Sequence, residues 1–216
     1  MGRTLFIFDL DGTLVDSAGD LAAAVNRTRA DFGLAPIPAD TVAGYVGDGI
    51  TMLMTRALSD CPGMDIERAV RVQKAHYMAH LCDSTRPYTG VEEGLRRLRA
   101  HGHPLAVATN KPVDMTEILL KELRLRPLFD AVCGGGSVPD LKPHPAMLEA
   151  IMARLGCGRE ETWMVGDNRT DLESARRAGV RSVFMRYGIG EAGPEKPDLT
   201  FETFDEFVTC FLGERT

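Results

Sequence analysis

Short apolar runs alternate with polar segments along most of the chain. The first run, Leu5–Phe8, ends at Asp9, a pattern typical of a buried strand that closes in a turn. Comparable runs lie at 105–108, 131–133, 163–165 and 182–184, each near Gly, Asn or Asp. These five runs predict the strands of a sheet.

From about residue 88 onward, segments with helical spacing separate the strands. Apolar residues recur every three or four positions from 91 to 98, before Gly102, and from 115 to 123, after Pro112. This alternation predicts an α/β fold with a Rossmann-like parallel sheet and helices on both faces. Reactive groups then gather at the carboxyl ends of the strands.

The stretch 16–86 has a different pattern. It has helical spacing and no convincing strand, and a turn-rich segment, 86–90, closes it. We therefore predict a core formed by 1–15 and 87–216, with 16–86 as a small helical insertion.

Composition narrows the class of protein. The 216 residues carry 25 Lys and Arg against 31 Asp and Glu, a net charge of -6, which argues against broad electrostatic binding to nucleic acid or to anionic membranes. The five cysteines are widely spaced without a C-x-x-C pair, and we expect them to be reduced. No apolar run approaches a signal peptide or a membrane span. We expect a cytoplasmic protein without nucleic-acid or membrane partners.

Asp9 and Asp11 are the first candidates for chemistry. They are two residues apart, so in a continuing strand their carboxylates lie on one face and repel each other. A cation, or a proton held by one of them, relieves the repulsion. The alternative is a simple hydrogen-bonded Asp-x-Asp-Gly turn, which the longer string Asp9–Thr13 makes less favourable.

The segment Phe8–Ser17 resembles the first motif of the haloacid dehalogenase superfamily of phosphohydrolases. Val107–Lys111 resembles the second motif, a strand that ends in a phosphate-binding hydroxyl. Leu141–Pro145 resembles the third, which holds the phosphate with a lysine, and Val165–Asp171 resembles the acidic, metal-binding fourth. The four motifs occur in the family's order over most of the chain.

Further segments resemble the phosphoglycolate phosphatases of this superfamily. They are Tyr45–Ile50, Asn110–Pro112, Gly134–Gly135, Lys142–Pro145 and Tyr187–Gly188. This resemblance implies hydrolysis of a small phosphate ester, 2-phosphoglycolate, to glycolate and phosphate.

A carboxylate can attack a phosphate dianion only where positive charge offsets their repulsion. Mg²⁺ and Lys142 can supply that charge. In this interpretation Asp9 attacks phosphorus to give an aspartyl-phosphate, and Asp11 gives a proton to the leaving alkoxide and later takes one from water. Asp9, the backbone carbonyl of Asp11 and Asp167 are the expected oxygen ligands of Mg²⁺.

The remaining core motif residues have supporting roles. We expect Thr109 and the amide of Asn110 to hold phosphoryl oxygens, and Asp171 to orient Lys142 or a metal-bound water. Each of these motif residues also has a simpler structural interpretation. Lys142 could be a solvated loop lysine, Thr109–Asn110 an ordinary strand-end turn, and Asp171 the N-cap of the helix that follows.

The resemblance implies that the 16–86 insertion is a cap that selects the substrate and limits water. We expect the loop Gly47, Asp48 and Gly49 to approach the leaving group, the alternative being a turn between helices without ligand contact. A substrate carboxylate needs a cationic or amide partner. Arg27, Arg56 and Lys74 are candidates that the sequence does not separate.

Other functions remain open at this level. A phosphomutase like β-phosphoglucomutase uses the same residues, a phosphatase of other small-molecule specificity shares them, and a catalytically silent binding module keeps only the fold. A haloacid dehalogenase needs a nucleophile like Asp9 but neither a metal nor a second acid, so Asp11 and Asp167 argue against it. The chain could be a monomer or a homodimer.

Overall fold

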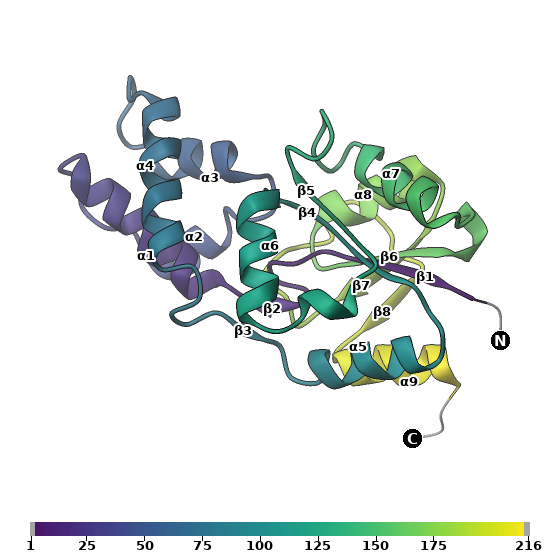
Figure 1. Cartoon of the computed structure of the whole chain (residues 1–216). Helices are drawn as coiled ribbons and strands as arrows, with labels where there is room; N and C mark the ends of the chain where they lie inside the picture. The colour runs from purple at the N-terminus through teal and green to yellow at the C-terminus, as the bar shows by residue number, and fades with distance from the viewer. Residues whose placement is uncertain (1–2, 214–216) are drawn as a thin grey trace.

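The computed structural model describes residues 3–213, and its centre is a six-stranded parallel sheet in the order β5-β4-β1-β6-β7-β8 (Figure 1). The strands are β1 (Leu5–Phe8), β4 (Leu105–Pro112), β5 (Ala131–Gly135), β6 (Thr162–Gly166), β7 (Arg181–Met185) and β8 (Leu199–Phe201). The five strands expected from the sequence are present, and the predicted parallel α/β fold is confirmed. β8 is a sixth strand that the hydrophobic pattern does not indicate.

Alternate side chains of each strand point to opposite faces of the sheet. Since apolar side chains point to both faces, helices cover both of them. Phe6 and Phe8 of β1 face a hydrophobic cluster built with α5 (Val91–Ala100), α6 (Val113–Glu122) and α9 (Phe204–Leu212). Leu5 and Ile7 face a second cluster, built with α7 (Ala146–Leu155) and α8 (Arg169–Ala178). Short 3₁₀ turns at Arg126–Leu128 and Arg159–Glu161 complete the core. β1 therefore has no solvent-facing side, and its four residues are fully buried.

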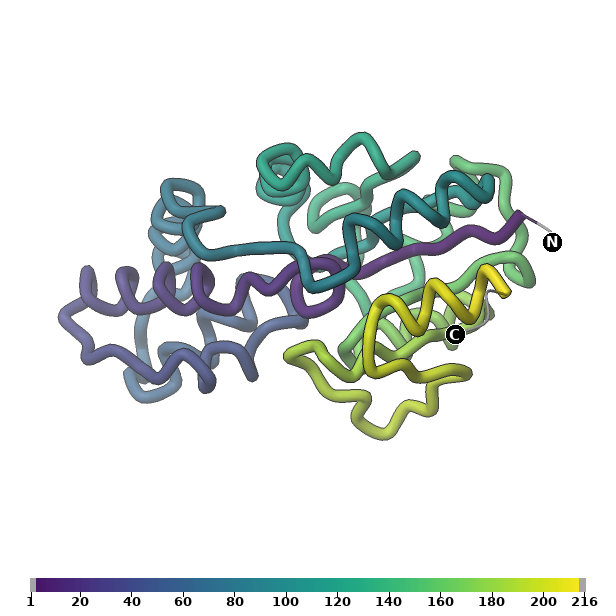
Figure 2. The backbone as a smooth tube through the Cα atoms, turned by 90° about the horizontal axis from the view of Figure 1, so that it is seen from below, coloured from purple at the N-terminus to yellow at the C-terminus, as the bar shows by residue number. Residues whose placement is uncertain are grey.

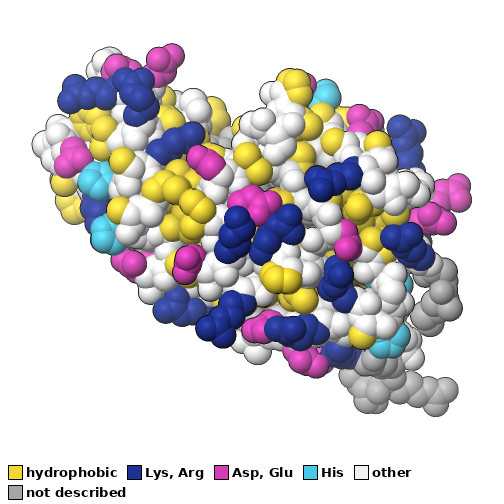
Figure 3. Space-filling model, in the orientation of Figure 1, with side chains coloured by type: hydrophobic (Ala, Val, Ile, Leu, Met, Phe, Trp, Pro, Cys, Tyr) yellow, Lys and Arg dark blue, Asp and Glu magenta, His cyan; other side chains and the backbone are white. Residues whose placement is uncertain are grey.

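The segment between β1 and α5 is helical and lies to one side of the sheet (Figures 1 and 2). Its helices are α1 (Ala18–Asp31), α2 (Ala39–Ala43), α3 (Ile50–Ala57) and α4 (Ile66–Ala79). We refer to 16–86 as the cap and to the rest as the core, and this division remains our proposal; of the predicted core, residues 1–2 and 214–216 lie outside the described part. The space-filling surface is notched between the two parts (Figure 3).

Two short strands carry the chain into the cap and back. β2 (Val15–Asp16) pairs antiparallel with β3 (Arg86–Pro87), so that Val15 lies opposite Pro87 and Asp16 opposite Arg86. Within residues 3–213, no helix combines the length and the apolar character needed to cross a membrane.

Candidate active site

The predicted reactive residues lie at the carboxyl ends of three adjacent strands. Asp9 follows β1, Asp167 follows β6, and Thr109–Lys111 lies in β4 just before its last residue, Pro112. The backbone N–H of Asp9 donates to the carbonyl of Val165 at 2.9 Å, which extends the β1–β6 pairing to the reactive residue. Parallel pairing thus brings together side chains that are far apart in sequence.

Three buried carboxylates meet at these strand ends. Asp9, Asp167 and Asp171 each offer an oxygen within 4.8 Å of the other two, and their exposed fractions are 6%, 1% and 0%. The Lys142 ammonium lies 2.9 Å from Asp9 Oδ1 and 2.6 Å from Asp171 Oδ1. Lys142 is itself buried, so the reading of it as a solvated loop lysine is wrong.

Asp167 is held by three hydrogen bonds. Its Oδ1 accepts from Thr13 Oγ1 at 2.6 Å, and its Oδ2 accepts from the backbone N–H groups of Ile189 and Gly190 at 3.0 and 2.9 Å. Burial, together with the charges of Asp171 and Asp9, nevertheless raises the pKa of Asp167 to about 8. Thr13 is a site residue that the sequence analysis missed.

Three buried carboxylates gather here around the single ammonium of Lys142, which contacts Asp9 and Asp171. A further cation at this point would relieve the repulsion among them, and an all-oxygen donor set fits a hard divalent ion such as Mg²⁺. The carboxylates of Asp9 and Asp167 are two of the three predicted metal ligands.

Asp171 is engaged on both oxygens. Oδ1 accepts from Lys142 and Oδ2 accepts from the backbone N–H of Asn168 at 3.0 Å. The N-cap of α8 is Asn168, and Asp171 is the third residue of the helix, where its side chain completes a capping box with Asn168. The prediction that Asp171 is itself the N-cap is therefore wrong. These contacts suit Asp171 to orienting Lys142.

Asp11 is paired with a second buried lysine. Its Oδ1 accepts from Ser17 Oγ at 2.5 Å and from Lys111 Nζ at 2.9 Å. Lys111 also donates to the hydroxyl of Tyr77 on α4, at 2.7 Å, and so joins the core to the cap. Burial disfavours the charged lysine, but the negative charge of Asp11 and the hydrogen bonds that Lys111 donates to Asp11 and to the Tyr77 hydroxyl outweigh this and raise the pKa of Lys111.

The side chain of Asn110 holds two loops in place. Its Nδ2 donates to the carbonyls of Gly47 and Lys142, both at 2.8 Å, and its Oδ1 accepts from the backbone N–H of Lys142 at 2.8 Å. Thr109 Oγ1 accepts from the backbone N–H of Lys111 at 3.2 Å. Phosphate binding by Thr109 and by the Asn110 amide stays a prediction.

The cap loop 47–49 reaches the core. Gly47 has φ +116, and a Cβ there would lie 2.5 Å from Asn168 Nδ2, so only glycine allows this approach. Asp48 points elsewhere, since it pairs with Arg56 and, at 2.9 Å, with Arg169 of the core. Gly47 and Gly49 therefore lie beside the site, whereas Asp48 fastens the loop from outside.

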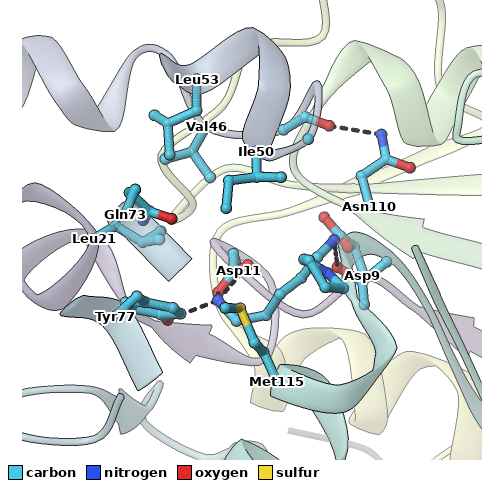
Figure 4. A pocket seen from close by; sticks show the side chains of 15 residues that line it. Asp9, Asp11, Leu21, Val46, Ile50, Leu53, Gln73, Tyr77, Asn110 and Met115 are labelled. Carbon is cyan, nitrogen blue, oxygen red and sulfur yellow. Dashed lines mark hydrogen bonds and ion pairs between the residues drawn. The ribbon is translucent and has the colours of Figure 1, made fainter. Parts of the chain in front are cut away.

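A small cavity of about 50 Å³ lies between cap and core (Figure 4). Polar groups that line it come from the core residues Asp9, Asp11, Thr109, Asn110 and Lys111 and from the cap residues Gln73 and Tyr77. The other lining residues are Leu21, Val46, Gly47, Gly49, Ile50, Leu53, Pro112 and Met115. None of the three cap cations suggested for a substrate carboxylate, Arg27, Arg56 and Lys74, lines this cavity. Lys111, Gln73 and Tyr77 were missed; for Lys111 alone the sequence held a signal, its position directly after Thr109-Asn110.

Comparison with known proteins identifies the family. Residues 6–185 match the family model described as haloacid dehalogenase-like hydrolase. A phosphoglycolate phosphatase of Colwellia psychrerythraea is 39% identical over 219 residues, covering 95% of this chain and 96% of its own. One from Neisseria meningitidis serogroup A is 41% identical over 189 residues, covering 85% and 80%. The crystal structure of a predicted phosphoglycolate phosphatase from Haemophilus somnus superposes with a TM-score of 0.91 at 32% identity, covering 97% of this chain and 98% of its own. The chain belongs to the haloacid dehalogenase-like hydrolase family, as its motifs indicate.

Proposed function

We propose that this hydrolase cleaves a small phosphate monoester by way of a phosphoryl group carried on Asp9. The observation that carries the proposal is the Lys142 ammonium between Asp9 and Asp171, with Asp167 alongside. The ammonium neutralises part of the charge that a carboxylate and a phosphate dianion bring together. Asp9, Asp167 and the backbone carbonyl of Asp11 are the groups we propose to hold Mg²⁺, which when bound supplies the remaining positive charge.

The side chains divide the reaction into two displacements. An Asp9 oxygen forms a bond to phosphorus while the ester P–O bond breaks, and Asp11, which has to be protonated at the start of this step, gives that proton to the leaving alkoxide. Water then attacks the same phosphorus, Asp11 takes a proton from it, and the bond to Asp9 breaks. Ser17 and Lys111 fix the orientation of Asp11 in both steps.

We propose 2-phosphoglycolate as the substrate. Proteins named phosphoglycolate phosphatase are 39 to 41% identical to this chain over most of its length. A cavity of about 50 Å³ also suits a substrate of few atoms. The cap, residues 16–86, would enclose the part of the substrate beyond the phosphate.

A panel of substrates tests the proposed substrate and the proposed phosphatase activity separately. We expect kcat/KM for 2-phosphoglycolate to exceed that for glucose 1-phosphate, glucose 6-phosphate and AMP by at least about tenfold, the order that one well-placed charged contact provides. Equal values would refute the substrate and leave the phosphatase. Failure to release phosphate from any of them, with halide release from 2-chloropropionate, would refute the phosphatase itself.

A further inference from the structure

Gln73 is a buried amide without a partner. It is the one glutamine of the chain, it lies on α4 of the cap, and 1% of it is exposed. Neither Oε1 nor Nε2 has a hydrogen-bond partner among the described residues. Buried polar groups nearly always have hydrogen-bond partners, and one left unpaired destabilises a fold. The contacts among the described residues therefore do not explain why this amide is buried.

The amide faces the reactive residues. Gln73 and Tyr77 are one helical turn apart on the buried face of α4, and both line the cavity that Asp9 and Asp11 line from the core. Figure 4 shows Gln73 on the cap side of this cavity and Asp9 across from it. A substrate whose phosphate meets Asp9 therefore extends its other end towards Gln73.

The charged side chains that line the cavity are those of Asp9, Asp11 and Lys111, and of these only Lys111 can attract an anionic end of the substrate. Among the described lining residues, Lys111 carries the one positive charge, and it lies between Asp11 and the Tyr77 hydroxyl. The cap contributes the Gln73 amide and the Tyr77 hydroxyl, while its other lining side chains are apolar. An ammonium and neutral hydrogen-bond donors in an apolar wall suit a small carboxylate.

We propose that Gln73 is a specificity-determining residue, whose Nε2 donates to the carboxylate of the substrate while Lys111 supplies the counter-charge. The inference rests on the proposed function and names the group that reads the part of 2-phosphoglycolate beyond the phosphate. In this proposal one amide of the cap and one lysine of the core contact the substrate carboxylate, in place of the three cap cations that the sequence suggested.

The test compares two substrates that differ in one group. Ethyl phosphate has a methyl group where 2-phosphoglycolate has its carboxylate. The variant Gln73→Met keeps the length of the side chain and removes the amide, and because Gln73 has no partner to lose, the variant is expected to fold. Lys74→Met, at the next position but outside the cavity, is the matched control.

We expect Gln73→Met to lower the ratio of the two kcat/KM values, 2-phosphoglycolate over ethyl phosphate, by about 10- to 100-fold, the range for a hydrogen bond to a charged group. Glycolate should inhibit the variant more weakly, and Lys74→Met should keep the wild-type ratio. An unchanged ratio in Gln73→Met, or equal losses with both substrates, would overturn the inference while the proposed function stands. A wild-type enzyme that does not prefer 2-phosphoglycolate over ethyl phosphate would instead refute the proposed substrate.

Discussion

At the scale of single residues, Lys142 stabilises the acidic cluster. Its ammonium contacts Asp9 and Asp171, and all three side chains are buried. Removing one partner of a buried ion pair leaves a charge without compensation, at a cost of about 3–5 kcal/mol. The ammonium that we propose to offset the phosphate charge is therefore also the one that stabilises these buried carboxylates.

Lys142→Met should lower kcat by at least about 100-fold, because the transferring phosphoryl group loses a fixed positive charge. The variant should also unfold at a lower temperature than wild type, and Mg²⁺ should recover part of the difference by supplying charge to the same carboxylates. Phosphate release and thermal unfolding with and without Mg²⁺ measure these effects. A kcat within a few-fold of wild type would contradict the role of Lys142.

Gly12 allows Asp167 to approach the first motif. Its φ is +90, and a Cβ there would lie 2.2 Å from Asp167 Oδ2. Gly12→Ala should therefore displace Asp167 and reduce activity at least about 100-fold, as small misplacements in active sites do. Gly33→Ala, at φ +72 with nothing within 4 Å, is the matched control. It should cost about 1–2 kcal/mol of stability from backbone strain alone and keep full activity.

The sequence predicts site residues that belong to a local motif, but not the partners that these residues contact from distant parts of the chain. Asp9, Asp11, Lys142, Asp167 and Asp171 belong to recognisable strings, and the structure brings them together. The partners of these residues cannot be found in the same way. Thr13 meets Asp167 across 154 positions, and Lys111 meets Asp11 across 100. Such pairs follow from strand order, which local pattern does not contain.

At the scale of elements, Asp20 fastens the two connections between core and cap. It lies in the first turn of α1 and accepts hydrogen bonds from the backbone N–H and hydroxyl groups of both Ser84 and Thr85, at 2.6 to 3.0 Å. Burial raises the pKa of Asp20, but these hydrogen bonds outweigh it, and the net pKa lies below 3.8. The charged form is therefore the one that stabilises the fold.

Asp20→Asn should lower the free energy of unfolding at neutral pH by about 2–3 kcal/mol, because an amide cannot accept all of these hydrogen bonds. A group with a depressed pKa contributes its stabilisation above its unfolded pKa of 3.8 and loses it as the pH falls through the lower folded value. The difference between variant and wild type should therefore shrink below that pH. Urea unfolding across pH measures it, with Asp16→Asn, an exposed neighbour, as control. A difference that stays constant down to low pH would contradict the role of the carboxylate.

Elements with a strong apolar period could be predicted, and those without one could not. The five expected strands are buried throughout most of their length, which produces continuous apolar runs. β8 has three residues at the edge of the sheet, none of them fully buried, and so carries little pattern. β2 and β3 have two residues each, because they pair only the two segments that connect core and cap, and strands this short have no apolar pattern.

For the molecule as a whole, the cavity beside the core carboxylates is lined from both cap and core. Asn110 of the core donates to Gly47 of the cap, Lys111 contacts Tyr77, and Arg169 pairs with Asp48. These contacts join the cap to the core beside the cavity that Asp9 and Asp11 line. The sequence predicts the insertion and its position but not which of its residues face the core.

Metal removal tests the charge balance of this assembled site. Because burial and the charges of Asp171 and Asp9 raise the pKa of Asp167 to about 8, this carboxyl is mostly protonated at neutral pH, and Mg²⁺ binding should release its proton. Mg²⁺ affinity should therefore rise between pH 6 and pH 8, and EDTA should abolish hydrolysis until Mg²⁺ is restored. Calorimetry in buffers of different ionisation enthalpy counts the protons released. Hydrolysis that persists in EDTA would contradict the need for a cation.

The proposal that Asp9 carries the phosphoryl group is tested most directly by measuring the covalent state of Asp9 during turnover. The enzyme is mixed with 2-phosphoglycolate and Mg²⁺, quenched in acid within a turnover, and analysed by mass spectrometry of its peptides. We expect one phosphoryl group on Asp9 in the wild-type enzyme, and neither a phosphoryl group nor turnover in Asp9→Asn. Steady release of phosphate with no phosphoryl group on Asp9, or with one on another residue, would contradict it.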